Sequence, residues 1–175
     1  MKFVQGSPSP RRKPAARIVV RVVRLAKDRA AAFDIRRRVF QDEQGVSAEE
    51  EFDGDDDRAV HVLARVGSTA VGTARLLFGP RYAKVGRMAV LRAWRRRGIG
   101  RALLDTCVGI AGKHGVSHLV LHAQVHAIPF YTAVGFSVVS EEFEEAGIPH
   151  RRMERRLMPK PPIRSPWAGN ARPTR

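Results

Sequence analysis

Two glycines set among five arginines, where an amphipathic helix should begin, constrain this chain more than any other feature. The segment from Val85 to Val108 reads VGRMAVLRAWRRRGIGRALLDTCV, an apolar run followed by a basic Gly-Ile-Gly turn and residues with helical apolar spacing. The first N–H groups of a helix lack intrahelical partners and, together with the helix dipole, attract anions. Gly98 and Gly100 would let the backbone approach a pyrophosphate where a Cβ would clash. The segment therefore predicts a strand–turn–helix unit that binds phosphate.

Four arginines around this turn could bind a phosphate-bearing ligand, bind DNA or face solvent. Arg95, Arg96, Arg97 and Arg101 would add positive charge to a phosphate site, and one could reach a further phosphate on the same ligand. A P-loop needs Gly-Lys-Ser/Thr, and a dinucleotide fold needs G-x-G-x-x-G with an early acidic residue; the order of elements here matches neither. A DNA-binding arm and a solvated basic turn are the alternatives. We interpret residues 95–101 as a phosphate cradle.

Positive charge is concentrated at the two ends of the chain. Of the net charge of +15, residues 1–17 supply five basic side chains and residues 159–175 supply four, with no acid in either segment. The +6 that remains on residues 18–158 still suggests an anionic ligand. Both ends are rich in Pro, Ser and Gly, so we expect disordered basic tails over residues 1–16 and 159–175. Such tails would attract nucleic acid only non-specifically, if at all.

The rest of the composition fits one domain in a reducing compartment. With 175 residues, 43% of them hydrophobic, the chain can build one core, and we place the domain at residues 17–158. The single cysteine, Cys107, excludes an intramolecular disulfide and a cysteine-based zinc site, and its spacing places it in the core. No apolar run reaches the roughly 18 residues of a membrane span, and the N-terminal segment lacks a secretory h-region. We expect a cytoplasmic protein without a membrane partner.

The periodicity of apolar residues predicts an α/β domain with a mixed sheet. Helices are expected at residues 28–40, from 100 to about 113 and at 127–134, with an acidic loop at 48–57. Gly115 is expected to cap the second helix, and Gly135 to end the third. Strands are expected at residues 16–25, 59–66, 69–78, 84–90, 117–125, 136–143 and 150–157.

Two motifs in this chain resemble the GNAT superfamily of N-acetyltransferases. Arg95, Gly98 and Gly100 are similar to its Arg/Gln-x-x-Gly-x-Gly/Ala signature for acetyl-CoA binding. Downstream, QVHAIPFYTAVGF resembles its Asn-x-x-Ala-x-x-x-Tyr-x-x-x-Gly-Phe block, with Gln124 where asparagine is usual. The residues that match that block are Ala127, Tyr131, Gly135 and Phe136. The resemblance covers about residues 18–157, and the segments IRRRVFQDEQGV and EEFEEAGIPHRRM resemble a bacterial branch of mostly uncharacterised members.

This resemblance implies a mixed, largely antiparallel sheet of about six to seven strands flanked by helices. It also implies acetyl-CoA as co-substrate, direct transfer of the acetyl group to the amine of a small molecule or peptide, and a possible homodimer. The backbone of the strand before the cradle, with Met88, Ala89 and Val90, would hold the pantetheine arm. The backbone from Arg96 through Ile99 to Arg101 would hold the pyrophosphate, and Gln124 would supply a hydrogen bond.

The resemblance also points to Tyr131 as the acid that protonates the CoA thiolate, because a phenol with a pKa near 10 stays protonated at neutral pH. The alternative is an aromatic side chain that only packs under a helix. The general base is open between His122 and Glu43. If residues 121–126 are extended, His122, Gln124 and His126 share one face. The terminal hairpin, with Glu142, Glu145 and His150, could also line the acceptor cleft.

No residue pattern demands a metal. An EF-hand that started at Asp53 would need glycine at its sixth position and glutamate at its twelfth, where Arg58 and Ala64 stand. A solvated acidic turn is therefore expected, with attraction of a cationic amine as the alternative. Two other functions remain open. One is a non-catalytic acyl-CoA-binding module with nucleic-acid-binding tails, and the other is transfer of a longer acyl group, which the cradle cannot discriminate.

Overall fold

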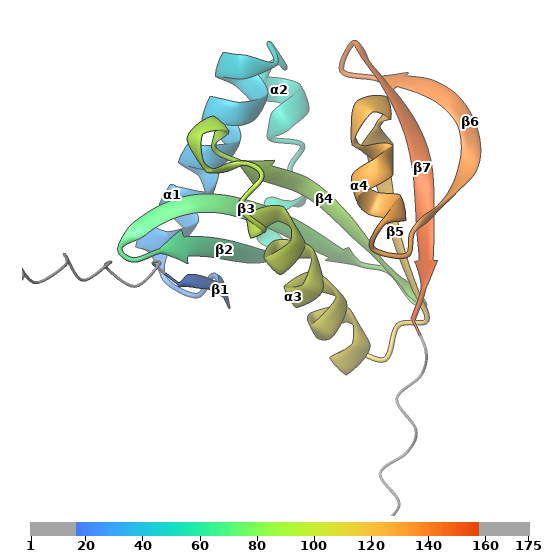
Figure 1. Cartoon of the computed structure of the whole chain (residues 1–175), viewed down its shortest axis with the longest axis horizontal. Coiled ribbons are helices and arrows are strands. Elements are labelled where there is room, and N and C mark those ends of the chain that lie inside the picture. Colours follow the sequence, from blue (N-terminus) through green and yellow to red (C-terminus); the bar gives the residue numbers. More distant parts are fainter. Residues whose placement is uncertain (1–16, 158–175) are drawn as a thin grey trace, which may run out of the picture.

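A seven-stranded sheet in the order β1-β2-β3-β4-β5-β7-β6 forms the centre of the molecule (Figure 1). The computed structural model describes residues 17–157; the expected tails lie outside the described residues. All neighbouring strands are antiparallel except β4 and β5, which are parallel. The strands are β1 (Ile18–Val22), β2 (Val60–Val66), β3 (Thr69–Phe78), β4 (Tyr82–Val90), β5 (His118–Gln124), β6 (Ser137–Glu145) and β7 (Ile148–Arg156).

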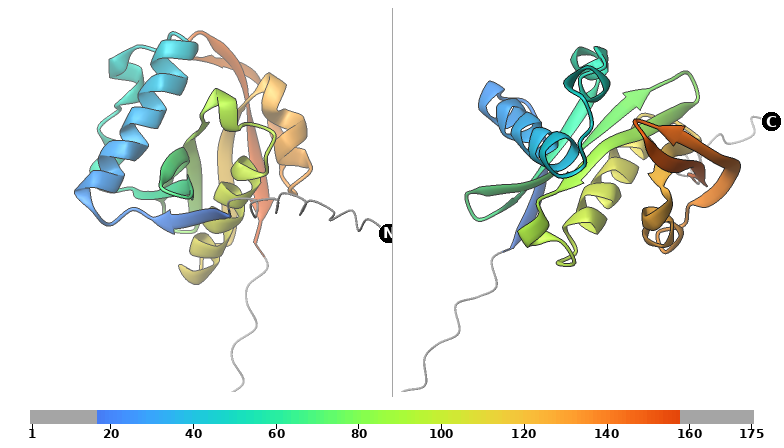
Figure 2. Two further views of the ribbon diagram at one scale, coloured as in Figure 1. Left: turned by 60° about the vertical axis from the view of Figure 1, so that its left-hand side comes forward. Right: turned by 90° about the horizontal axis from the view of Figure 1, so that it is seen from above.

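Helices cover both faces of this sheet (Figure 2). On one face lie α1 (Ala26–Arg36), which continues as the π-helix η1 (Arg37–Glu43), and the short α2 (Ala48–Glu51) with the 3-10 turn η2 (Asp55–Asp57). On the other lie the 3-10 turn η3 (Arg92–Trp94), α3 (Ile99–Lys113), the 3-10 turn η4 (Val125–Ala127) and α4 (Ile128–Thr132). Within residues 17–157, no helix is long and apolar enough to cross a membrane.

The main core lies between α3 and the sheet. Leu103, Leu104 and Cys107 of α3 are fully buried there, as their helical spacing predicts. Burial raises the pKa of the Cys107 thiol to about 12, so this cysteine is a core residue and remains protonated. In β5, Leu119 and Leu121 alternate into the same core. The alternate positions of β5, among them His122 and Gln124, therefore face the opposite side of the sheet, where the site is found.

Every expected helix and strand is present, with shifted ends. The first helix was expected at residues 28–40 but starts at Ala26 and passes into the π-helix at Arg37. A π-turn holds more residues than an α-turn, and an apolar spacing of four residues does not reveal it. The segment expected as a helix at 127–134 begins as a 3-10 turn and ends at Thr132. Gly115 and Gly135 follow their helices with positive φ, as expected.

Two irregularities in the middle of the sheet open the site. β4 and β5 pair only from Tyr82 to Lys84 on one strand and from His118 to Val120 on the other, and beyond that point they separate (Figure 1). The register between β3 and β4 shifts between Thr73 and Arg75, where Arg87 adopts a φ of 47°. This is a β-bulge, which redirects the side chains of the second half of β4. A strand pair that diverges next to a bulge leaves backbone groups unpaired.

Candidate active site

A cleft of about 1380 Å³ opens where β4 and β5 separate. The α1–η1 segment, the acidic loop, the β6–β7 turn and the cradle complete its walls. It brings together most of the site residues expected from the sequence: Met88, Ala89, Val90, Arg95, Arg96, Gly98, Gly100, Arg101, His122, Gln124 and Tyr131. Three expected residues, Arg97, Ile99 and Glu43, are not among the residues that line it.

The cradle has the backbone that its glycines predict. Gly98 precedes α3 in the left-handed conformation with a φ of 79°, and Arg96 has a φ of 59°. No side chain caps α3 and its first turn contains no acid, so its first N–H groups face the cleft without a competing anion. A Cβ on Gly100 would meet only the Phe130 ring, at 3.5 Å. Packing within the chain therefore does not require glycine at position 100, whereas close approach of a ligand would.

Most arginines of the cradle already have partners within the chain. Arg95 donates from Nε to the carbonyl of Val90 at 2.9 Å and from Nη2 to Glu43 Oε2 at 2.6 Å. Arg97 lies over the Trp94 ring, and Arg101 pairs with Asp105. Backbone groups and Arg96, for which the described residues show no ion pair, are thus the groups most available to an anion.

Glu43 lies at the end of η1, where the ion pair with Arg95 occupies its carboxylate. This contact links η1 to the cradle. The prediction that Glu43 is the general base has no support from this geometry, because the group is engaged by a cation and does not line the cleft.

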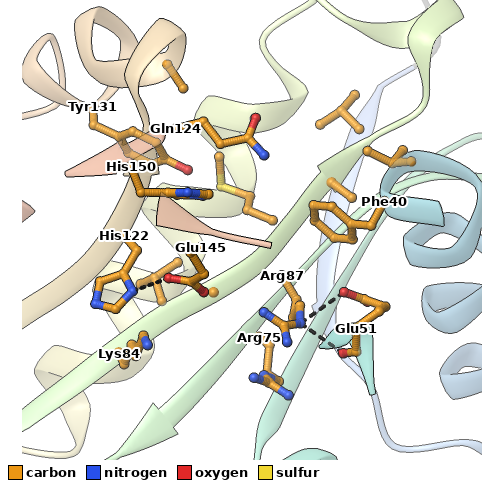
Figure 3. Close-up of a pocket in the computed structure, with 18 of the residues that line it drawn as sticks. Phe40, Glu51, Arg75, Lys84, Arg87, His122, Gln124, Tyr131, Glu145 and His150 are labelled. Atoms are coloured by element: carbon orange, nitrogen blue, oxygen red, sulfur yellow. Dashed lines mark hydrogen bonds and ion pairs between the residues drawn. The ribbon is translucent and has the colours of Figure 1, made fainter. Parts of the chain in front are cut away.

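Tyr131 belongs to α4 and is buried, but it borders the cleft (Figure 3). It is 9% exposed and makes edge contacts with Phe130 and Phe136, whose ring centroids are 5.0 and 6.0 Å away. Burial raises the pKa of the Tyr131 phenol to about 12, with a smaller contribution from Cys107. The side chain therefore has both properties considered for it: it packs as an aromatic residue, and it presents a protonated hydroxyl at neutral pH.

His122 is held by Glu145, which was expected only as one of several residues of the terminal hairpin that could line the cleft. Its Nδ1 lies 2.5 Å from Glu145 Oε2 (Figure 3). The Phe143 ring packs edge-on against the imidazole. Because an ionised carboxylate only accepts, Nδ1 donates, which leaves Nε2 free to accept in the neutral ring. The hydrogen bond from His122 lowers the pKa of Glu145 to about 2. The alternation of β6 places Phe143 and Glu145 on one face, but their register against β5 follows only from the fold.

Gln124 and His126 do not share a strand face as expected. β5 ends at Gln124, and His126 belongs to η4, although both line the cleft. The Gln124 amide donates from Nε2 to Gln44 Oε1 at 3.1 Å and so bridges the cleft to the end of η1. Sequence reasoning did not find Gln44 as a site residue, because its partner is 80 residues away.

The acidic loop is not the solvated turn that was expected. Arg36 is fully buried and bonds Glu51 and Asp56, while Arg75 and Arg87 share Asp53. The hydrogen bond from Arg75 holds the pKa of Asp53 well below its ordinary value. Burial raises the pKa of Glu51 despite its arginine neighbours. Three arginines thus balance three acids in one wall of the cleft. Among residues 17–157, no group of His, Cys, Asp or Glu could hold a metal ion.

Comparison with known proteins identifies this arrangement. Residues 26–157 match the family model described as an acetyltransferase (GNAT) domain. The chain belongs to the GNAT acetyltransferase family. It is similar to the uncharacterized N-acetyltransferase YjcF of Bacillus subtilis, with 39% identity over 70% of this chain and 88% of YjcF.

Two solved structures extend this likeness to the fold of this GNAT protein. The crystal structure of Escherichia coli ElaA superposes with a TM-score of 0.72 at 28% identity, over 79% of this chain and 99% of ElaA. The crystal structure of an acyl-CoA N-acyltransferase from Pseudomonas aeruginosa superposes with a TM-score of 0.69 at 26% identity, over 79% of this chain and 98% of that protein. The expected fold class is confirmed, and the family match shows that the chain is an acyltransferase. The alternative of a non-catalytic module is therefore set aside.

Proposed function

We propose that this protein transfers an acetyl group from acetyl-CoA to a primary amine, by direct attack in a ternary complex. The observation that carries the proposal is the continuity of one cleft. It runs from the uncapped start of α3, past the unpaired edge of β4, to Tyr131 and His122. Such a cleft can hold a phosphate-bearing cofactor and an amine side by side.

The residues of the cofactor half fit acetyl-CoA, which supplies an activated acetyl thioester when bound. Backbone N–H groups from Ile99 to Arg101 would hold the pyrophosphate, since α3 has no capping side chain. From Val85 to Val90, the β5-facing edge of β4 has lost its partner strand. An extended pantetheine arm can hydrogen-bond there as an additional strand would.

The residues at the junction fit the proton transfers that the reaction needs. As the amine nitrogen bonds to the acetyl carbon, it must lose a proton, and as the C–S bond breaks, the sulfur must gain one. His122, oriented by Glu145, would accept the first proton at Nε2, directly or through water. Tyr131 would donate the second, because its hydroxyl stays protonated at neutral pH. The acceptor is a small-molecule or peptide amine.

The test is release of CoA, measured with a thiol-reactive dye. The full chain is incubated with acetyl-CoA and a panel of small amines, polyamines and peptides. We expect turnover with at least one class of amine and a strong loss in Tyr131→Phe. If acetyl-CoA binds, as a thermal shift would show, but no amine is acetylated, the proposed reaction is wrong. If acetyl-CoA does not bind, the phosphate cradle is wrong as well.

A further inference from the structure

We propose that the acceptor amine carries a carboxylate, and that Lys84 and Arg87 bind this carboxylate over Gly86 on the floor of the cleft. The inference rests on the proposed function and narrows it to ω-amino acids or to short peptides with a free C-terminus. All three residues belong to β4 and line the acceptor half of the cleft (Figure 3).

Lys84 supplies the positive charge. It is half-buried in the cleft, and no acid among the described residues lies within ion-pair distance of its ammonium group. Its strand partner, Val120, lies two residues before His122 on β5, so Lys84 and His122 face the same side of the sheet. The ammonium also contributes to the low pKa of Glu145, which places it near the His122–Glu145 pair.

Arg87 supplies N–H donors from the side of the cleft that contains Glu51 and Asp53. Its Nε contacts Glu51, and its Nη2 donates to the carbonyl of Glu50 and to Asp53. Its remaining nitrogen, Nη1, makes no hydrogen bond to the described residues. The guanidinium contacts Glu51 and lies across the cleft from Glu145 and Lys84 (Figure 3). A carboxylate there would accept from two cationic groups that approach from different sides.

Gly86 provides the space between these two cations. A Cβ on Gly86 would have no heavy atom within 4 Å, so the position is open to the cleft. Arg75 lies opposite Gly86 in the β3–β4 register, and its buried Nε finds no hydrogen-bond partner in the described part of the chain. Because buried N–H groups are nearly always paired, an unmet donor beside an open floor is consistent with a polar ligand.

Lys84 is the group that selects an anion, because the charges in the wall built around the acidic loop balance one another. Arg36, Arg75 and Arg87 are balanced by Glu51, Asp53 and Asp56, so that wall orients a ligand without adding net charge. Gly86 precedes Met88 by two residues, about 7 Å along the strand. The carboxylate and the reacting amine of an ω-amino acid or a short peptide can therefore occupy the two ends of this distance, whereas the two groups of an α-amino acid lie too close together to span it.

Matched acceptor pairs test the inference. Rates of CoA release are compared for glycine, γ-aminobutyrate and a tripeptide, each against its carboxamide, in wild type and in Lys84→Met. We expect Lys84→Met to lower the preference for the carboxylate of γ-aminobutyrate and of the tripeptide by about tenfold, chiefly through KM. For each pair, the ratio of the rate with the carboxylate to the rate with the carboxamide is compared between wild type and variant. Differences in nucleophilicity between the two amines of a pair are the same in both enzymes and therefore cancel. Lys84→Arg should keep the preference, and so should Lys113→Met, which removes an exposed lysine at the end of α3. The three pairs distinguish α-amino acids, ω-amino acids and peptides.

An unchanged preference for these two carboxylates in Lys84→Met overturns the carboxylate site, whatever the activity. If no amine is acetylated although acetyl-CoA binds, γ-aminobutyrate is added to the CoA complex and followed by saturation-transfer NMR. Binding that disappears in Lys84→Met supports the carboxylate site while the proposed reaction fails. Absence of binding to the wild type overturns the site itself.

Discussion

The two halves of the cleft are built in different ways. The half proposed to bind the cofactor is made of backbone: the start of α3, the turn at Gly98 and the unpaired edge of β4. The acceptor half is made of side chains that come from distant segments, such as Glu145 on His122 and Gln124 on Gln44. A backbone site serves one cofactor for a whole family, whereas a side-chain site can vary with the acceptor. Variants that affect one half and spare the other test this division.

Tyr131→Phe should have the largest effect, because it removes the proposed proton donor between the two halves. General acid catalysis contributes roughly a hundredfold to ten-thousandfold, so we expect kcat to fall about a thousandfold. The ring remains and its packing against Phe130 and Phe136 is kept, so acetyl-CoA binding should not change. Stopped assays of acetylated product with calorimetric titration of acetyl-CoA separate the two quantities. Loss of both together would show that Tyr131 only supports the cofactor half.

Arg36→Met should weaken the acceptor half through stability. Arg36 is fully buried and bonds two acids, and loss of one partner of a buried ion pair costs about 3 kcal/mol. Urea denaturation should therefore show a free energy of unfolding lower by about that amount. Arg38→Met, on the exposed side of the same segment, is the control and should cost little. Equal stabilities for the two variants would mean that the network does not hold the wall.

Gly100→Val tests the cofactor half. An added Cβ meets only the Phe130 ring within the chain, and the side chain projects where the pyrophosphate is proposed to lie. We expect acetyl-CoA binding to weaken about a hundredfold, as for the loss of one or two charge-assisted hydrogen bonds. Gly109→Val is the control, because it makes the same glycine-to-valine change in helix propensity in the same helix and has open space around it. It should bind acetyl-CoA normally. Normal binding by Gly100→Val would refute the cradle.

The same division explains what the sequence could predict. The cradle lies within a few residues of the chain, so its glycines and arginines indicated a phosphate site before any fold was known. Tyr131 was found through its resemblance to a family block of fixed spacing. Glu145, Gln44 and Arg36 act on partners 15 to 80 residues away, and only the register of the sheet and the packing of α1 bring them together. Glu43 was considered as a base from its position in the chain alone, which could not reveal its contact with Arg95, 52 residues away; the role stays a prediction.

Glu145→Gln should show that His122 depends on the carboxylate that orients it. The amide can present its NH2 group as well as its oxygen to Nδ1, so the imidazole no longer has one preferred tautomer. We expect kcat to fall about tenfold with an unchanged KM for acetyl-CoA, a modest part of the full contribution of a base. Glu144→Gln, on the neighbouring residue of β6, should behave as the wild type. Long-range proton–nitrogen NMR spectra of His122 report the tautomer independently of turnover.

The smallest effect should appear in the pH dependence of stability. The pKa of Glu145 is lowered from 4.5 to about 2 by its bond to His122, so the folded state favours the ionised carboxylate. The stabilisation is thus fully present above pH 4.5 and is lost as the pH falls toward 2. Because Glu145 is partly exposed, solvent screening keeps this contribution small. Thermal unfolding of wild type and Glu145→Gln between pH 7 and pH 3 should show a Tm gap that closes toward acid. A gap that widens instead would mean that Glu145 is not held by His122.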